Sequence, residues 1–539
     1  MATRRIGSVH HVLLGDLAVR QARSGFDPLP ADLLRGRSLG VVCEQHRECA
    51  DTLGRRLRRR DRRDRRRRGH PRSAAPSSQG DRIVTESADV DTIVIGGGMA
   101  GLPFALRAAR RGSTVLIEGD LLGGTCLNRG CIPTKTMIHS AKVAHVARRA
   151  GEFGIDVGSV SVDLGRIVDR KDAIVEAVRN GSYRAAERAT NLTLVENWAR
   201  FVGPHAVEAG GAVYRAARIV INTGARPTVP DLPGIGEVPI LDSTSALDLR
   251  EVPEHLIVMG GGYVGCEFAQ MYRRFGSQVT VVHRRSRLLP AEDPEASEVI
   301  ERVFAREGIE LLLGEEPTAV RAANGRIDLS VGGRDVEASH LLLAVGRTPN
   351  TSRLGLEIPG VAVDERGFIV ASERFETSAA GIHAIGDVIG PPLFTHSARD
   401  DAALLARHLF RGEDITTSTR LVPHAVFTDP EVATFGMTAG EAETRYGESV
   451  VGVENFRGVA RAKAIGETDG FVKIVTRPDR VIVGATIVGP DAGNLIHELV
   501  VAAYAELTVD RVRNAIHIHP TLAEAVNAAA GGVHRPTTA

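Results

Sequence analysis

The chain has 539 residues, of which 43% are hydrophobic, and a formal net charge of +1 at pH 7. This length exceeds what a single hydrophobic core usually serves, so two or three packed domains are expected. No apolar run reaches the roughly 18 residues that a membrane-spanning helix needs, and the amino terminus lacks the apolar stretch of a secretory signal. These features argue against a membrane partner and favour a cytoplasmic location.

The charge is unevenly distributed. Residues 55–68 read RRLRRRDRRDRRRR and hold eleven Arg and two Asp, a local charge of +9. Such a run could bind nucleic acid, but its composition is typical of a solvated tail, and the chain as a whole has 62 Arg against five Lys. We therefore expect residues 1–89 to form a disordered extension, and nucleic acid is not expected as a partner. A GTG start codon at Val84 would leave residues 1–83 untranslated, which amino-terminal sequencing of the native protein would test.

From Asp91 the sequence DTIVIGGGMAGLPFALRAARRGSTVLIEGD predicts a buried strand, a glycine-rich turn, an Ala-rich helix and a second strand that ends at Glu118. This is the order of a dinucleotide-binding βαβ unit. Gly96, Gly98 and Gly101 fit the G-x-G-x-x-G motif, which places a pyrophosphate at the helix N terminus, where free N–H groups favour an anion. Glu118 follows Gly96 by 22 residues and is placed to accept hydrogen bonds from a ribose. A glycine turn without a ligand is the weaker interpretation, because the strands, the helix and the acid accompany the motif.

The same pattern returns at residues 256–290, LIVMGGGYVGCEFAQMYRRFGSQVTVVHRRSRLLP. The glycines of this second turn are Gly260, Gly262 and Gly265. Two such units imply two bound dinucleotides. At the end of the second strand, His283, Arg284 and Arg285 replace the expected carboxylate. Because Arg can pair with a 2′-phosphate that a carboxylate would repel, NADP is expected, with NAD as the alternative. The general preference for arginine is a competing explanation for these two side chains.

A close pair of cysteines follows the first unit. The segment GGTCLNRGCIPTK, residues 123–135, separates Cys126 and Cys131 by five positions and precedes a stretch with helical spacing. Pro133 suits the first turn of that helix, so Cys131 is expected near a helix N terminus, which lowers the pKa of a thiol. A metal site would need further soft ligands, but the only later cysteine, Cys266, falls inside the second nucleotide helix. No metal is therefore expected, and a structural disulfide is disfavoured in a reducing compartment.

This segment resembles the active site of the class I pyridine nucleotide-disulfide oxidoreductases, which include dihydrolipoamide dehydrogenase, glutathione and mycothione reductases and mercuric reductase. The resemblance covers residues 90–530 and includes VGRTPN at 345, HAIGDV at 383 and HIHPTLAEA at 517. It implies that Cys131 lies against the flavin of FAD as the charge-transfer thiol and that Cys126 attacks the substrate. Lys135 would lie beside the flavin, with Glu267 as its partner.

The resemblance implies further cofactor-binding residues. Asp387 corresponds to the aspartate that binds the ribityl chain of FAD, and Thr395 to a residue that contacts the flavin ring. The remaining candidates in these motifs are Gly124, Thr125, Thr223, Gly224, Gly346 and Arg347.

His519 and Glu524 fit the H-P-x-x-x-E ending of the family. In this arrangement a carboxylate orients an imidazole, which exchanges protons with the substrate thiols. The family's histidine comes from the other subunit, so the resemblance implies a homodimer. A helix cap or a surface pair is the alternative interpretation, and His517 is the competing histidine, although only His519 precedes Pro520.

The expected fold class is α/β, with two Rossmann-like domains and a C-terminal α+β dimerisation domain. The FAD domain is expected at 90–240 and again at 350–415, the NAD(P) domain at 241–349 and the dimerisation domain at 420–530. The expected activity is that of an NAD(P)H-dependent flavoprotein that reduces a small-molecule disulfide or another electron acceptor. Alternatives are a mercuric reductase-like metal or quinone reductase, although the tail lacks the cysteine pair of mercuric reductases, and a non-catalytic flavoprotein or nucleotide sensor, which would not need the cysteine and histidine sites.

Overall fold

The computed structural model describes residues 86–533. The arginine-rich run 55–68 and the segment 1–83, on which the start-codon hypothesis depends, lie outside the described residues. The prediction of a structureless extension is wrong for residues 86–89, which form strand β1 (Glu86–Asp89). The backbone of β1 pairs in parallel with β7 (Ala212–Arg215), so hydrogen bonding to a neighbouring strand overrides a composition that is poor in strand-forming residues. The sheet has the order β1-β7-β6-β5, with β6 at Ala206–Ala209 and β5 at Arg200–Gly203.

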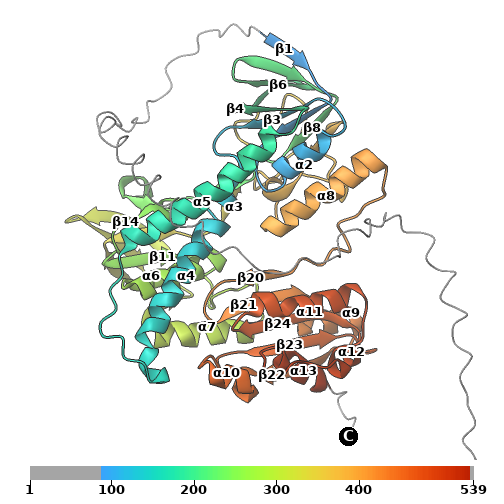
Figure 1. Ribbon diagram of the computed structural model, residues 1–539. Coiled ribbons are helices and arrows are strands. Elements are labelled where there is room, and N and C mark those ends of the chain that lie inside the picture. The colour runs from blue at the N-terminus through green and yellow to red at the C-terminus, as the bar shows by residue number, and fades with distance from the viewer. Residues whose placement is uncertain (1–85, 534–539) are drawn as a thin grey trace, which may run out of the picture. The chain divides into compact units, whose positions relative to one another are not determined.

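The first nucleotide unit is a five-stranded parallel sheet of order β19-β8-β2-β3-β4. Its strands are β2 (Thr92–Ile95), β3 (Thr114–Glu118), β4 (Leu192–Glu196), β8 (Arg218–Ile221) and β19 (Ile382–Ala384). The central strands are apolar throughout because helices cover a parallel sheet on both faces. Helix α2 (Gly101–Ala108) joins β2 to β3, and α8 (Thr395–Arg411) lies beside α2 (Figure 1). The two helices pack through stacked rings of Phe104 and Phe410, 5.8 Å apart.

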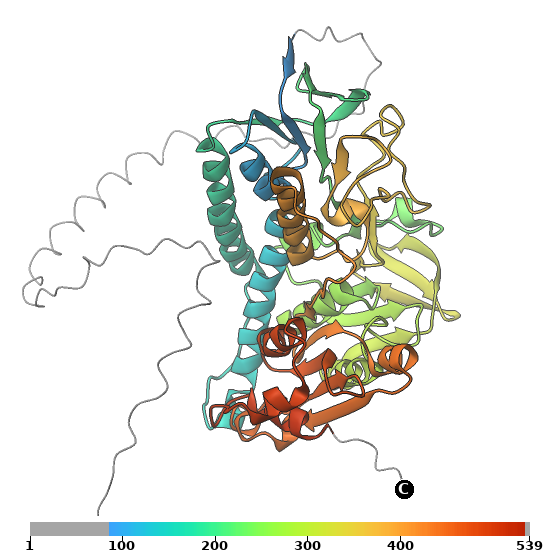
Figure 2. The ribbon, with the colours of Figure 1, turned by 90° about the vertical axis from the view of Figure 1, so that its right-hand side faces the viewer.

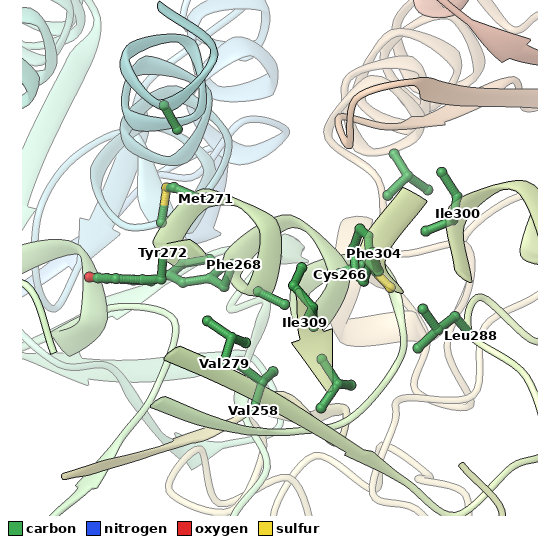
Figure 3. Packing of buried hydrophobic residues seen from close by; sticks show 14 of the residues in the cluster. Val258, Cys266, Phe268, Met271, Tyr272, Val279, Leu288, Ile300, Phe304 and Ile309 are labelled. Carbon is green, nitrogen blue, oxygen red and sulfur yellow. The ribbon is translucent and has the colours of Figure 1, made fainter. Parts of the chain in front are cut away.

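The second nucleotide unit is also a five-stranded parallel sheet, of order β10-β17-β11-β12-β13. Its strands are β10 (Ile240–Leu241), β11 (His255–Met259), β12 (Gln278–His283), β13 (Ile309–Leu313) and β17 (His340–Leu343). Helices α6 (Tyr263–Phe275) and α7 (Pro294–Arg306) cover it. Figure 3 shows Phe268 and Tyr272 of α6 packed toward Val258 and Val279 of the sheet. A three-stranded antiparallel sheet, β14 (Pro317–Ala323), β15 (Arg326–Val331) and β16 (Arg334–Ala338), follows in the chain.

The C-terminal part is an antiparallel sheet with helices packed on it, coloured orange to red in Figure 1. Its strand order is β20-β21-β24-β23-β22. The strands are β20 (His424–Val426), β21 (Glu431–Gly436), β22 (Val450–Asn455), β23 (Phe471–Thr476) and β24 (Ile482–Gly489). The helices are α9 (Ala439–Tyr446), α10 (Ala460–Ala464), α11 (Ala492–Tyr504), α12 (Val509–Asn514) and α13 (Glu524–Gly531). The predicted fold class, two Rossmann-like units followed by an α+β domain, is confirmed.

Three helices lie in the chain between β3 and β4 of the first nucleotide unit. They are α3 (Gly124–Asn128), α4 (Cys131–Arg148) and α5 (Leu164–Glu187). Helix α4 packs against both α5 and α6, and the views in Figures 1 and 2 show α4 and α5 next to each other. Among residues 86–533, no helix is both long and apolar enough to cross a membrane.

Candidate active site

The first glycine turn is too crowded for larger residues. Gly96 has φ of 99°, and a Cβ at this position would lie 2.2 Å from the carbonyl oxygen of Asn222. A Cβ on Gly101 would lie 1.9 Å from the carbonyl oxygen of Gly96. A Cβ on Gly124 would lie 2.8 Å from Cα of Gly98, so the start of α3 contacts the turn directly. The turn therefore brings the predicted pyrophosphate site next to the short helix that carries Thr125 and the first cysteine.

Glu118 lies at the end of β3, with its carboxylate directed at the glycine turn. Its Oε2 accepts the N–H of Gly97 at 2.7 Å, and its Oε1 accepts the N–H of Asp120 at 2.9 Å. Burial raises the pKa of Glu118, and the two backbone hydrogen bonds oppose that effect. The carboxylate is thus held in place at the end of the second strand, where dinucleotide folds bind a ribose.

A second carboxylate follows another strand of the same sheet. Asp387 follows β19 in the 3₁₀ turn Gly386–Ile389, and burial raises its pKa while the charge of Arg347 lowers it. Burial lowers the pKa of Arg347, against the charges of Asp387 and Cys131. The structure therefore brings together three predicted residues that are far apart in the sequence.

Two short strands hold the arginine in place. Arg347 opens β18 (Arg347–Pro349), which pairs with β9 (Ala225–Pro227), and its guanidinium donates to the carbonyl of Ala225. Its Nε is buried and has no hydrogen-bond partner among residues 86–533. Such an unpaired buried donor is costly unless a ligand accepts from it.

Thr223 and Gly224 form the exit from β8. The Thr223 hydroxyl donates to the carbonyl of Asn350 at 2.9 Å, and the N–H of Asn350 donates to the carbonyl of Gly224 at 2.9 Å. The loop after β8 is thereby fastened to the loop after β18. Together with the glycine turn, the two strand-end carboxylates and the free donor of Arg347, these residues fit FAD.

The two cysteines lie in consecutive helices. Cys126 is inside α3, Cys131 is the first residue of α4, and both are free and partly buried thiols. The Sγ of Cys131 lies 3.4 Å from the Oγ1 of Thr395, the first residue of α8. The predicted flavin-contact threonine and the predicted charge-transfer thiol are thus neighbours.

The pKa values of the two thiols are shifted in opposite directions. A hydrogen bond from Cys126 lowers the pKa of Cys131 to about 6, against the effect of burial, and Thr395 and the charge of Lys135 lower it further, whereas Glu267 raises it. The pKa of Cys126 is raised, first by its interaction with Cys131 and then by burial. At neutral pH the reduced pair is therefore one thiolate, at Cys131, and one thiol, at Cys126.

Lys135 lies one helical turn after Cys131 and forms an ion pair with Glu267, as the resemblance implies. Its Nζ is 2.9 and 2.8 Å from the two carboxylate oxygens, and the side chain of Glu267 is only 6% exposed. Glu267 also accepts the N–H of Phe427 at 3.0 Å, and Lys135 lies over the ring of Phe427 at 4.7 Å. This pair connects α4, α6 and the residues after β20.

The second glycine turn is crowded at two positions and open at the third. Gly260 has φ of 122°, and a Cβ on Gly265 would lie 1.8 Å from the carbonyl oxygen of Gly260. A Cβ on Gly262 would meet no atom within 4 Å, which leaves space at the N terminus of α6. Gly346 has φ of 132°, and its carbonyl accepts the N–H of Thr228 at 3.0 Å.

The end of β12 differs from the end of β3. In the place of Glu118 stands His283, whose ring packs under the turn, so that a Cβ on Gly261 would lie 2.9 Å from it. Its Nε2 is buried without a hydrogen-bond partner in the described part of the chain. Burial lowers the pKa of His283, and the charges of Arg284 and Arg285 lower it further. Both arginines are exposed directly after the strand.

His519 and Glu524 form the predicted pair. Nδ1 of His519 lies 2.9 Å from Oε1 of Glu524. The other carboxylate oxygen, Oε2, accepts the N–H of Thr521 at 2.9 Å. The hydrogen bond from His519 lowers the pKa of Glu524. The competing His517 has both ring nitrogens engaged, with the carbonyl of Ala515 and with Glu498, each at 3.0 Å. Of these two histidines, His519 is the one with a ring nitrogen that has no hydrogen-bond partner among residues 86–533, and its side chain is 72% exposed.

The sequence matches the family described as pyridine nucleotide-disulphide oxidoreductase over residues 90–402, and the dimerisation domain of the same family over residues 422–530. The chain belongs to this family. It is 38% identical over 457 residues to a dihydrolipoyl dehydrogenase of Haloferax volcanii, covering 82% of this chain and 95% of that protein. It is 34% identical over 447 residues to a mercuric reductase of Bacillus cereus, covering 82% of this chain and 71% of that protein.

The fold is similar to that of a solved family member, the HOCl-induced flavoprotein disulfide reductase RclA of Escherichia coli. The TM-score is 0.75 at 31% identity, and the match covers 81% of this chain and 98% of that one. Family members typically use FAD, a pyridine nucleotide and a redox-active disulfide, and the Cys126–Cys131 pair fits the last of these. Within residues 86–533, no group of three or more His, Cys, Asp or Glu side chains could hold a metal ion.

Two further residues at this site, Asn222 and Phe427, were not predicted from the sequence. Asn222 contacts the first glycine turn, and Phe427 completes the surroundings of Lys135 and Glu267. Asn222 could have been suspected because it directly follows a buried strand of a nucleotide-binding sheet. Phe427 gives no such signal, because its role depends on a contact with a distant helix.

Proposed function

We propose that this protein is an NADPH-dependent flavoprotein that reduces a small disulfide through Cys126 and Cys131. The observation that carries the proposal is the position of Cys131, whose sulfur lies at the N terminus of α4 beside Thr395 with a pKa of about 6. When bound, FAD would accept a hydride from the nicotinamide and pass an electron pair to the cysteine disulfide. Thr395, Lys135 and Asp387 would hold it against the cysteines.

The two cysteines would then act as nucleophiles in two successive steps. Cys126 attacks one sulfur of the substrate disulfide, forms a mixed disulfide and releases the first substrate thiol. The Cys131 thiolate attacks the sulfur of Cys126, releases the second substrate thiol and restores the Cys126–Cys131 disulfide. Each cycle uses the two electrons of one NADPH and two protons to make two thiols.

A base is needed because Cys126 is the protonated member of the pair. The His519–Glu524 pair suits this role: the carboxylate orients the ring, and the second nitrogen is free. Among the described residues, no hydrogen bond links His519 to Cys126 or Cys131 of its own chain, so we propose that it serves the partner subunit of a homodimer. The family's dimerisation domain supports this, as do Ile516 and Ile518, which shortly precede His519 and are 101% and 77% exposed in a single chain.

The preference for NADPH rests on the end of β12. A carboxylate there would repel a 2′-phosphate, but the chain has His283 at this position, followed by the exposed Arg284 and Arg285. An arginine can form paired hydrogen bonds with a phosphate. This arrangement supports NADPH as the electron donor and gives NADH no equivalent partner for its ribose.

The experiment that tests the proposal compares electron donors and acceptors. The FAD-loaded protein is assayed with NADPH and NADH against lipoamide, glutathione disulfide, mycothione, a quinone and Hg(II). We expect turnover of at least one disulfide with NADPH, and loss of that turnover in Cys126→Ser. Efficient reduction of the quinone or of Hg(II) by Cys126→Ser, with no disulfide reduced by the wild type, would contradict the proposal.

A further inference from the structure

A buried carboxylate outside the thiol site joins the second nucleotide unit to the C-terminal domain. Glu292 lies between β12 and α7, and its side chain has no exposed surface. Its Oε1 accepts the hydroxyl of Tyr263 and lies 2.8 Å from Nε2 of His424, and its Oε2 accepts the hydroxyl of Thr434 at 2.7 Å. Burial would raise the pKa of Glu292, but the hydrogen bonds from His424, Tyr263 and Thr434 lower it below its usual value. The carboxylate is therefore an anion with three side-chain donors.

The rings held by Glu292 reach the thiol site. Tyr263 stacks on Phe394 at 6.0 Å and 18°, and Phe394 stacks on His424 at 5.1 Å and 8°. Tyr263 and His424 also contact each other, with ring centroids 5.7 Å apart. Phe394 immediately precedes Thr395, whose hydroxyl lies 3.4 Å from the sulfur of Cys131. Phe394 is therefore bonded directly to the residue that contacts the sulfur of Cys131.

Tyr263 also marks the beginning of the dinucleotide helix. It is the first residue of α6 and follows Gly262, the open position of the second glycine turn. A dinucleotide whose pyrophosphate bound at this helix end would lie next to Tyr263. The orientation of that ring therefore affects how the nicotinamide approaches the flavin.

The loop that carries Glu292 is itself attached to the glycine turn. The N–H of Leu289 donates to the carbonyl of Gly261 at 2.7 Å, and the N–H of Glu292 donates to the carbonyl of Leu289 at 2.9 Å. Leu289 is completely buried with φ of 48°, a left-handed conformation that a leucine adopts only under constraint. The loop thus holds a strained backbone that directs the carboxylate toward Tyr263.

We propose that Glu292 is a positioning residue for the NAD(P)H site, which acts by fixing the rings of Tyr263 and His424 together. A glutamine at this position keeps one oxygen that can accept from both rings, but this oxygen is uncharged, and the amide N–H group replaces the oxygen that accepts from Thr434. Because hydrogen bonds to a charged group are stronger than those to a neutral one, the two rings would be held more weakly, and the nicotinamide would approach the flavin less favourably. The inference rests on the proposed use of NAD(P)H and FAD, but not on the identity of the disulfide.

The test separates the two half-reactions of the full-length, FAD-loaded protein. Flavin reduction by NADPH is followed by anaerobic stopped-flow, with NADPH deuterated at the transferred hydrogen as a second substrate. Flavin reduction by dithiothreitol, which enters through the cysteines, is measured in parallel. In Glu292→Gln we expect reduction by NADPH to slow roughly 10- to 100-fold, because small misplacements of reacting groups have effects of this size. We expect a larger isotope effect and a dithiothreitol rate within about twofold of the wild type.

Two further variants keep the result interpretable. Glu301→Gln is the matched control, because Glu301 accepts the N–H of Leu288 in the same loop at 2.9 Å but, within residues 86–533, forms no hydrogen bond with Tyr263, His424 or Thr434. This variant should match the wild type in both half-reactions. Tyr263→Phe keeps the ring and removes one donor, so it should reproduce part of the Glu292→Gln defect and add little to it in the double variant. If Glu292→Gln does not retain FAD, Tyr263→Phe decides the question.

Equal losses in both half-reactions of Glu292→Gln, or no loss in either, would overturn the proposal, as would a Tyr263→Phe variant with wild-type NADPH kinetics. If dithiothreitol fails to reduce the wild type, the proposed disulfide chemistry fails instead. The comparison of NADPH rates between variants would still decide the role of Glu292.

Discussion

Replacing Cys126 with alanine should make Cys131 a weaker acid. The hydrogen bond from Cys126 is the strongest influence that lowers the pKa of Cys131 to about 6, and the alanine variant removes it while leaving Thr395 and Lys135 in place. A hydrogen bond to a charged group contributes about 1.5–3 kcal/mol. Since one pH unit corresponds to about 1.4 kcal/mol, the titration midpoint of Cys131 should rise by about one to two pH units.

The assay is the rate of alkylation of Cys131 by iodoacetamide as a function of pH, measured by mass spectrometry of the peptide that contains it. Only the thiolate reacts, so the rate follows the ionised fraction. Cys126→Ser is the matched control: its hydroxyl keeps a donor beside Cys131, and its midpoint should stay closer to the wild-type value. Identical midpoints for the alanine and serine variants would refute the reasoning, because they would show that the donor at position 126 does not stabilise the thiolate.

Three further changes test other parts of the site. His519→Ala should slow disulfide turnover by roughly 10²- to 10⁴-fold, the usual contribution of an acid–base residue, and leave flavin reduction by NADPH nearly unchanged in stopped-flow; equal losses in both steps would assign His519 another role. Arg284→Ala should raise the KM for NADPH about 10- to 100-fold and that for NADH less than about twofold, the effect of one charged hydrogen bond to phosphate; a parallel rise for both nucleotides would exclude recognition of the 2′-phosphate. Gly101→Ala should lower the free energy of unfolding by about 1–3 kcal/mol or more in a melting experiment and weaken FAD retention, because its Cβ would lie 1.9 Å from a backbone oxygen. Gly151→Ala is the control and should be neutral in the same experiment, because a Cβ there meets nothing within 4 Å.

The sequence predicted those features that depend on local spacing. The two glycine turns follow from a motif within six residues between a strand and a helix, and the position of Cys131 at a helix N terminus follows from Pro133 and the helical spacing after it. Glu118 was found because the length of a βαβ unit fixes where its second strand ends.

The remaining features depend on contacts between distant residues. Tyr263 and His424 lie 29 and 132 positions from Glu292, and no local pattern marks any of the three. Strand β1 was missed because its pairing with β7 comes from a strand more than a hundred residues later, and not from the composition of its own four residues.

The most direct test of the central claim, that Cys131 exchanges electrons with the flavin, is an anaerobic titration with NADPH followed by visible absorbance. The two-electron-reduced wild type should show a long-wavelength band from the thiolate beside the flavin, which persists above and disappears below a pH of about 6, where the thiolate is protonated. Cys131→Ser should lack the band at every pH. An unchanged band in Cys131→Ser would contradict the account.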